Sequence, residues 1–255
     1  MSDYIKICDI EKYYGSGSHV TKAIDRLSFT VNKGEFTGIM GASGSGKTTL
    51  LNLLATIDRV SSGHIYYETT DITMLSEDAL SEFRKRNLGF VFQEYNLLDT
   101  LTIEENIVLA LTLQGGGRKK IQETSDKLLK LLHIEDIRGK FPYQVSGGQA
   151  QRCACARALA NDPVLLLADE PTGALDSFSA RTLLETFTAL NRTLGATILM
   201  VTHDAFSASY CSRILFLRDG QIFHELIRGE KSRKDFLQEI LDVLSLTGGE
   251  LSDAR

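Results

Sequence analysis

The stretch Gly41-Ala42-Ser43-Gly44-Ser45-Gly46-Lys47-Thr48 fits the phosphate-binding pattern G-x-x-x-x-G-K-[ST]. An apolar run at 36–40 precedes it and an apolar-faced segment at 47–57 follows it, which predicts a strand–loop–helix unit. Glycines let the loop turn its N–H groups inward, and the helix start adds its positive dipole end. We expect phosphates to be bound by Gly41, Ala42, Ser43, Gly44, Ser45, Gly46, Lys47, Thr48 and Thr49, with Thr48 also offering its hydroxyl to Mg²⁺.

Further apolar runs have the length of strands buried on both faces, as in a parallel sheet covered by helices. They lie at 88–92, 164–168, 197–201 and 214–217. Helical patterns alternate with them, which predicts an α/β fold with a mostly parallel core sheet. The first third predicts an N-terminal antiparallel β subdomain, and the turn signal at 32–35 predicts a hairpin into 36–40. Residues from about 94 to 160 are predicted to form a helical insert.

Composition excludes several classes of protein. The chain has 255 residues, 43% hydrophobic and 24% charged, which is typical of a globular protein and not of a disordered one. Its net charge of -5 argues against a broad basic surface for nucleic acid. No run approaches the roughly 18–20 apolar residues of a membrane span, and no signal peptide is expected, so another chain would do any spanning. The four cysteines, Cys8, Cys153, Cys155 and Cys211, form no C-x-x-C pair and are expected to be small buried thiols in a reducing cytosol.

Two carboxylates end the apolar run at 164–168. Asp169 and Glu170 would project from the end of a buried strand toward the nucleotide. In phosphoryl transfer the protein mostly positions groups and neutralises charge. We therefore expect Asp169 in the Mg²⁺ shell and Glu170 polarising the attacking water.

A second predicted helix start also has the chemistry of an anion site. Ser146, Gly147, Gly148 and Gln149 open a helix that runs to Leu159. Small residues there leave N–H groups accessible at the positive end of the helix dipole. One nucleotide rarely needs two such sites from one chain. This second site is therefore expected to complete the γ-phosphate site of a nucleotide bound to another subunit.

With these residues the chain resembles the ATP-binding subunits of ABC transporters over nearly its whole length, a P-loop NTPase fold. Ser146-Gly147-Gly148-Gln149 resembles their signature motif. The resemblance implies that Tyr14 stacks on adenine and that Gln93 senses Mg²⁺ and the γ-phosphate and touches the membrane partner. It also implies that Asp176 crosses the dimer interface and that His203 contacts the γ-phosphate. Ala150, where the family commonly has Gln, departs from the pattern without removing a phosphate contact.

The segments 88–102 and 169–176 resemble the clade that pairs with mechanotransmitting permeases, which includes lipoprotein-release systems. Within that clade, the segments 202–220 and 236–246 are similar to bacitracin-type peptide-resistance transporters. The apolar spacing at 236–244 predicts an amphipathic helix within a C-terminal segment at 232–255. The resemblance implies an ATPase domain at 1–231. It implies ATP and Mg²⁺ as cofactors, and a homodimer on an integral membrane permease at the cytoplasmic face of the membrane. A sensor histidine kinase is an optional further partner, and nucleic acid is not expected.

Other functions within the family stay open. One alternative is the motor of a lipoprotein-release, macrolide-efflux or cell-division complex, and another is a signalling ABC ATPase without net transport. A soluble ABC protein of translation or DNA repair is less consistent with one cassette, no heptad arm and an acidic charge. The apolar residues Leu97, Leu98 and Leu101 are equally consistent with a permease-docking surface and with buried core.

Overall fold

The computed structural model describes residues 4–16, 19–115 and 117–249. The strands are β1 (Ile5–Ser16), β2 (His19–Val31), β3 (Phe36–Met40), β4 (Ser62–Tyr67), β5 (Thr70–Asp71), β6 (Leu88–Val91), β7 (Leu165–Asp169), β8 (Ile198–Thr202), β9 (Arg213–Arg218) and β10 (Gln221–Ile227). The α-helices are α1 (Lys47–Leu54), α2 (Glu77–Asn87), α3 (Ile103–Leu113), α4 (Arg118–Leu131), α5 (Gly147–Leu159), α6 (Ser177–Leu194), α7 (Ala205–Ala208) and α8 (Arg233–Gly249). Short 3₁₀ helices lie at Ile72–Met74, Glu135–Ile137 and Pro142–Gln144.

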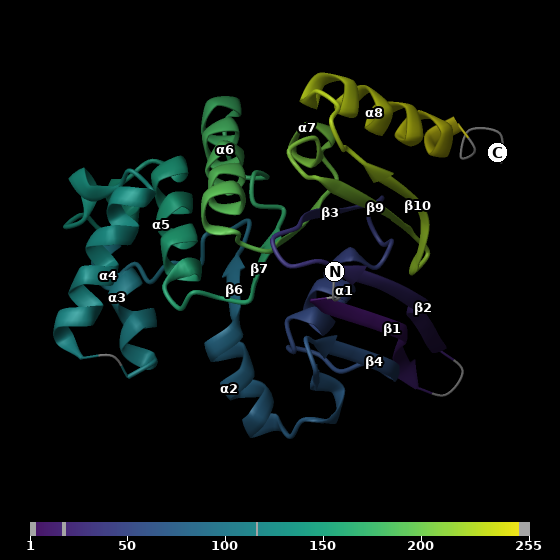
Figure 1. Cartoon of the computed structure of the whole chain (residues 1–255), viewed down its shortest axis with the longest axis horizontal. Coiled ribbons are helices and arrows are strands. Elements are labelled where there is room, and N and C mark those ends of the chain that lie inside the picture. Colours follow the sequence, from purple (N-terminus) through teal and green to yellow (C-terminus); the bar gives the residue numbers. More distant parts are fainter. Residues whose placement is uncertain (1–3, 17–18, 116, 250–255) are drawn as a thin grey trace.

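The strands form two sheets (Figure 1). The larger sheet has the order β10-β9-β3-β8-β7-β6, in which only the β9–β10 pair is antiparallel. The smaller, N-terminal sheet has the order β2-β1-β4-β5 and is antiparallel. The parallel part of the larger sheet carries β3, β7 and β8 side by side, so their carboxyl ends meet at one edge. This confirms the predicted α/β architecture and brings together the loops that follow these strands.

Side-chain alternation along the central strands divides the core into two clusters. Leu165 and Leu167 of β7 face a cluster with α1 and the N-terminal sheet. Leu166 and Ala168 face the opposite cluster, which includes residues of α3, α5, α6 and α8. Successive strand residues point to opposite faces, so both sides of the sheet must be covered. The apolar runs recognised in the sequence are therefore strands buried on both faces.

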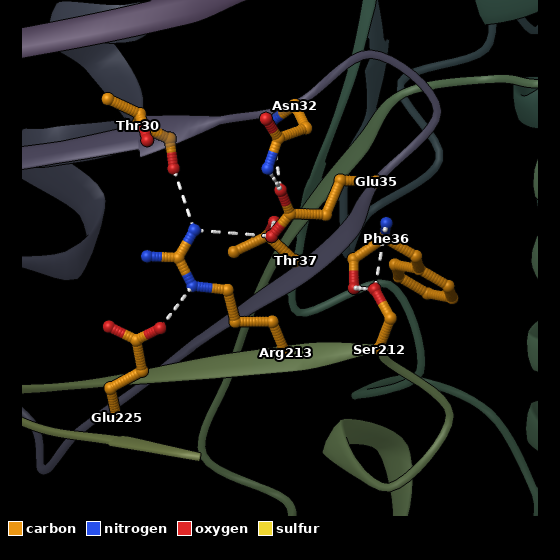
Figure 2. Close-up of polar contacts among 8 residues, drawn as sticks. All are labelled: Thr30, Asn32, Glu35, Phe36, Thr37, Ser212, Arg213 and Glu225. Carbon is orange, nitrogen blue, oxygen red and sulfur yellow. Dashed lines mark hydrogen bonds and ion pairs between the residues drawn. The ribbon is translucent and has the colours of Figure 1, made fainter. Parts of the chain in front are cut away.

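The expected hairpin from 27–31 into 36–40 is wrong. β2 pairs with β1, whereas β3 lies between β8 and β9 in the other sheet. The turn at 32–35 therefore passes the chain between sheets, and Figure 2 shows its polar contacts. Glu35 accepts hydrogen bonds from the backbone N–H of Asn32 at 2.8 Å and from Thr37 Oγ1 at 2.9 Å. Arg213 of β9 donates to Glu35 at 3.3 Å, to the carbonyl of Thr30 at 2.8 Å and to Glu225 at 2.7 Å, which joins the two sheets (Figure 2).

Helices α3, α4 and α5 gather at one side of the molecule, away from the N-terminal sheet (Figure 1). The helix α8 instead packs on α7, with Phe236 and Ile240 fully buried. Arg233 at its start lies over the rings of Tyr210 and Phe206, 4.4 and 5.1 Å from their centroids. The apolar face of α8 therefore serves core packing. Among the described residues, none of the helices is both long and apolar enough to cross a membrane.

The four cysteines are unpaired thiols. Cys153, Cys155 and Cys211 are buried, and Cys8 is half-buried. Burial raises the pKa of the Cys153 thiol to about 12, so it stays protonated and inert at neutral pH. The prediction that these residues behave as small hydrophobic side chains is confirmed for the three buried cysteines.

Candidate nucleotide-binding site

A cleft of about 690 Å³ opens at the carboxyl ends of β7 and β8, beside the loop between β3 and α1. It is lined by Thr21, Lys22, Ala23, Ala42, Ser43, Gly44, Gly46, Lys47, Thr48, Thr49, Asp169, Glu170, Val201 and His203. Residues far apart in the sequence thus meet here because their strands are neighbours. The structure brings most of the predicted phosphate loop together with both predicted acids and the predicted histidine.

The loop of residues 41–46 is held open by its glycines. Gly46 has a φ of 103°, and a Cβ atom there would lie 2.6 Å from the carbonyl oxygen of Ala23. It precedes α1 without any side-chain cap, so the helix N–H groups are not capped by a protein side chain. Lys47 Nζ donates to the carbonyls of Gly41 and Ala42, each at 2.8 Å. Gly41 and the buried Ser45 line a neighbouring pocket instead of the main cleft.

The cleft brings the cation of Lys47 together with two carboxylates, and Lys22 also lines it. Burial lowers the pKa of Lys47, and the charges of Glu170 and Asp169 oppose that shift. Burial also raises the pKa of Asp169, Glu170 adds to the rise, and Lys47 opposes it. A cation beside Asp169 would favour its charged form. The electrostatics therefore suit a ligand that brings both phosphate charge and a metal ion.

Glu170 and His203 form a pair at the mouth of the cleft. Glu170 Oε1 lies 2.8 Å from His203 Nδ1, and its side chain is 18% exposed against 72% for His203. Its backbone has a φ of 43°, an uncommon conformation for a residue other than glycine. Backbone hydrogen bonds to Val201 at 2.9 Å and from Gly173 at 3.0 Å hold it there. Such strain is retained where the surroundings fix the residue, here with its carboxylate facing the cleft.

The residues predicted as a second anion site lie elsewhere. Ser146 caps α5 by accepting a hydrogen bond from the N–H of Gln149 at 3.3 Å, and Gln149 bonds back to the Ser146 N–H at 3.0 Å. Asp176 caps α6 by accepting a hydrogen bond from the N–H of Ser179. Ser179 packs against Gly148, since a Cβ at Gly148 would lie 2.6 Å from Ser179 Oγ. Asp176 therefore lies in the same region as Ser146–Gln149. Within the described chain, neither Ser146–Gln149 nor Asp176 is among the residues that line the cleft. One copy of the chain therefore carries two separate groups of predicted site residues.

In the described chain, neither Gln93 nor Tyr14 is among the residues that line the cleft. Gln93 packs against Gly173, since a Cβ at Gly173 would lie 2.9 Å from Gln93 Nε2. Tyr14 pairs with Thr21 of β2, which does line the cleft, and donates its hydroxyl to Asp58 Oδ2 at 2.7 Å. Both residues are positioned by segments distant in sequence.

Sequence reasoning missed the side chains that hold these loops. Gln151 is fully buried and donates to the carbonyls of Phe92 at 3.0 Å and Pro171 at 2.9 Å. It thereby joins α5 to the residue before Gln93 and to the residue after Glu170. Arg157, also on α5, donates to the carbonyl of Tyr95 at 3.1 Å. No local pattern marks these residues, because their partners lie between 20 and 62 positions away.

Replacement of Gln151 by leucine should lower the free energy of unfolding by about 2 kcal/mol, because one buried and one partly buried carbonyl lose their donor. Urea unfolding followed by circular dichroism measures this change. The matched control is Gln238→Leu, at an exposed position of α8, which should stay within about 0.5 kcal/mol of the parent. Equal stability of the two variants would show that the Gln151 amide does not hold these loops.

Comparison with known proteins agrees with this geometry. Residues 24–173 match the family model described as ABC transporter. The chain is 48% identical over 249 residues to the bacitracin export ATP-binding protein BceA of Halalkalibacterium halodurans, covering 98% of each. It is 42% identical over 222 residues to the macrolide export ATP-binding/permease protein MacB of Syntrophobacter fumaroxidans, covering 86% of this chain and 31% of that longer protein.

A solved structure is similar throughout most of the chain. The ATP-binding cassette MJ0796 of Methanocaldococcus jannaschii, in a dimeric post-hydrolysis state bound to ADP and Pi, matches with a TM-score of 0.80. The two are 36% identical, with 88% of this chain and 98% of that chain covered. The family model, the full-length relatives and the phosphate-loop cleft agree. The chain belongs to the ABC transporter family, as an ATP-binding subunit that hydrolyses ATP.

Proposed function

We propose that this chain is the ATPase subunit of a transporter that confers resistance to antimicrobial peptides of the bacitracin type. Two copies would bind two ATP molecules with Mg²⁺ and drive an integral membrane permease from the cytoplasmic face of the membrane. Residues 1–231 would form the ATPase domain, with residues 94–160 as its helical subdomain and 232–255 as an added helix and tail. The observation that carries the proposal is the 48% identity to the bacitracin export subunit over 98% of both chains.

In the proposed site, residues 41–49 bind the phosphates, with Lys47 as the cation for the β- and γ-phosphates. Tyr14 would stack on adenine. Thr48, Asp169 and Gln93 would hold Mg²⁺, which when bound neutralises phosphate charge. The donor set fits this ion, because Mg²⁺ prefers oxygen ligands and is usually held by one or two carboxylates plus substrate phosphates. In the described chain, no larger group of acids, histidines or cysteines competes for a metal.

Hydrolysis would depend on Glu170. Its carboxylate accepts a proton from the attacking water, while His203 holds the carboxylate in place and contacts the γ-phosphate. The 2.8 Å Glu170–His203 contact supports this arrangement, because a proton acceptor must be held at a defined position. The strained Glu170 backbone is consistent with the same role.

The second group of residues, Ser146–Gln149 and Asp176, would act in the partner copy. Helix α5 presents its N-terminus with two glycines, a local arrangement that suits a γ-phosphate. Dimerisation is supported by the similar cassette, which was solved as a dimer. Each nucleotide would then lie between the phosphate loop of one copy and Ser146 of the other.

Macrolide export is the second candidate, favoured by the 42% identity to a macrolide export protein that joins ATPase and permease. We rank it lower because that match covers 86% of this chain, whereas the bacitracin export match covers 98%. Replacing Glu170 by glutamine in the host should therefore lower the inhibitory concentration of bacitracin-like peptides. A fall in the inhibitory concentration of macrolides alone would favour the second candidate.

The permease would dock in a groove of about 470 Å³ lined by Gln93, Glu94, Tyr95, Asn96, Leu97, Asp99, Pro142, Tyr143, Val145, Gly147, Ala150 and Ala174. Leu97 is half-buried and Leu98 is 48% exposed, so this segment offers apolar surface. A detergent pull-down with tagged Glu170→Gln protein from its host should recover a large membrane permease, identified by mass spectrometry. A sensor kinase recovered with it would identify the optional further partner.

The added substitution Tyr143→Glu, at a groove residue that is 71% exposed, should abolish this recovery. Leu194→Glu is the matched control, because Leu194 is 55% exposed at the end of α6, and it should keep the permease. Recovery of ribosomes or soluble proteins alone would contradict the membrane assignment.

A further inference from the structure

Tyr14 is held by two side chains that the nucleotide motifs do not include. Its hydroxyl donates to Asp58 Oδ2 at 2.7 Å, and Lys12 Nζ donates to Asp58 Oδ1 at 2.6 Å. Lys12 Nζ also lies 4.9 Å from the centroid of the Tyr14 ring and donates to the carbonyl of Arg59 at 2.8 Å. The Lys12 side chain is only 11% exposed. A partly buried ammonium and a carboxylate thus hold one aromatic ring from two directions.

We propose that Lys12 and Asp58 position the Tyr14 ring as the adenine platform and so determine the preference of this site for a purine nucleotide over a base-free polyphosphate. This inference rests on the proposed stacking role of Tyr14. It adds a specificity function for two residues outside the phosphate loop. Both act through Tyr14 and are positioning residues.

Tyr14 lies on a strand beside the nucleotide cleft. Tyr14 pairs with Thr21 across the β1–β2 ladder, and antiparallel partners share a face of the sheet. Thr21 lines the cleft, as does Thr49 of α1. Tyr13, the neighbouring tyrosine, instead pairs with Lys22 and lies under its ammonium at 5.4 Å. Lys22 lines the cleft as Thr21 does, so strand pairing alone does not choose between the two tyrosines. The hydroxyl of Tyr14, fixed on Asp58, favours Tyr14 as the platform.

The contacts leave one part of the ring available. Lys12 covers one face, and Asp58 occupies the edge that carries the hydroxyl. The residue is nevertheless 41% exposed, so part of it remains open to a ligand. A planar base stacking there would find the ring already fixed. Pre-organisation of this kind raises affinity because fewer rotamers are lost on binding.

The charges in this group are compatible with such a role. Burial acts to raise the pKa of Asp58, but the hydrogen bonds from Lys12 and Tyr14 together lower it below its ordinary range. Asp58 is therefore a carboxylate at neutral pH and accepts from both residues. Lys12 balances its charge, so the ring is held without an unpaired ion. Cation–π attraction adds to the orientation of the ring.

The test compares a ligand with a base and a ligand without one. Mg²⁺-ATP and Mg²⁺-tripolyphosphate are titrated calorimetrically into the full chain carrying Lys12→Met or Asp58→Ala. The Kd for ATP should rise about fivefold to tenfold in each variant, because the Tyr14 ring loses a contact that holds it in position. The Kd for tripolyphosphate should stay within about twofold, because the phosphate loop is unchanged. Lys12→Met keeps the apolar stem, which preserves packing if Asp58→Ala fails to fold.

Two further variants separate the possible outcomes. Tyr14→Ala should raise the Kd for ATP as much as either variant. Adding Asp58→Ala to Tyr14→Ala should raise that Kd no further. Glu77→Gln breaks the nearby exposed Arg59–Glu77 pair, which does not touch Tyr14, and should change neither Kd. If Tyr14→Ala leaves ATP binding intact, the proposed adenine platform is wrong. If Tyr14→Ala raises the Kd for ATP but Lys12→Met and Asp58→Ala do not, the positioning role is wrong. The positioning role is also wrong if Lys12→Met and Asp58→Ala raise the Kd for ATP and the Kd for tripolyphosphate equally.

Discussion

Replacement of Glu170 by glutamine is expected to lower ATP turnover by about 10²–10⁴-fold while leaving ATP affinity within about threefold of the parent. The amide keeps the size of the side chain but cannot accept the proton of the attacking water. The phosphate loop, including Lys47, is untouched, so the binding energy of the nucleotide remains. The variant should accumulate as a closed, ATP-bound dimer because hydrolysis is what would open it.

Phosphate release gives the turnover, and calorimetric titration gives the affinity. Size-exclusion chromatography with ATP shows the dimer. The matched control is Glu225→Gln, the same chemical change at the Arg213 network between the sheets, and it should keep normal turnover (Figure 2). Near-normal turnover of Glu170→Gln would remove this residue from the role of proton acceptor.

Replacement of Ser146 by arginine should lower ATP turnover at least about a hundredfold. It should not lower the affinity of the phosphate loop of the same chain for ATP. Ser146 is exposed at the N-terminus of α5, where the proposed partner nucleotide would dock. The bulky side chain would block this approach. Loss of the cap alone would destabilise the fold by about 1 kcal/mol.

Thr102→Arg separates these two effects. Thr102 caps α3 with the same type of capping box, in which its side chain and Glu105 exchange hydrogen bonds. The substitution should cost similar stability in thermal unfolding yet leave ATP turnover unchanged. Equal loss of turnover in both variants would attribute the Ser146 effect to stability and not to a partner nucleotide.

The parts of the fold that depend on local patterns could be predicted from the sequence. The apolar runs predict the buried strands, and the glycine-rich loop predicts the start of α1 at Lys47. Helix α1 nevertheless ends at Leu54, short of the apolar pattern that extended to Ile57. Thr56 adopts a φ of 56°, and Ile57 is 59% exposed. An apolar residue in helical register therefore did not mark the end of the helix.

Features set by tertiary pairing could not be predicted. The turn at 32–35 carries ordinary turn residues, but nothing local says whether the following strand joins the same sheet. Tyr14 was identified from its motif, yet its partner Asp58 lies 44 positions away. The bond from Gln151 to Phe92 spans 59 positions. Such contacts arise only when the sheet order brings distant loops together.

Each nucleotide site is proposed to be completed by a second copy of the chain. Lys47→Ala removes the cation of the phosphate loop, and Ser146→Arg blocks the site offered to a partner. Each variant alone should be inactive. In a mixed dimer, the intact loop of the Ser146→Arg copy would face the intact Ser146 of the Lys47→Ala copy, which restores one site of two.

The most direct measurement is therefore ATP turnover of an equimolar mixture of the two purified variants. Half of randomly formed dimers are mixed and each has one intact site, so the mixture should recover up to about one quarter of parent activity. Full activity of Ser146→Arg alone would contradict the claim, because each copy would then work by itself. Two inactive variants that stay inactive when mixed, although chromatography shows mixed dimers, would contradict it as well.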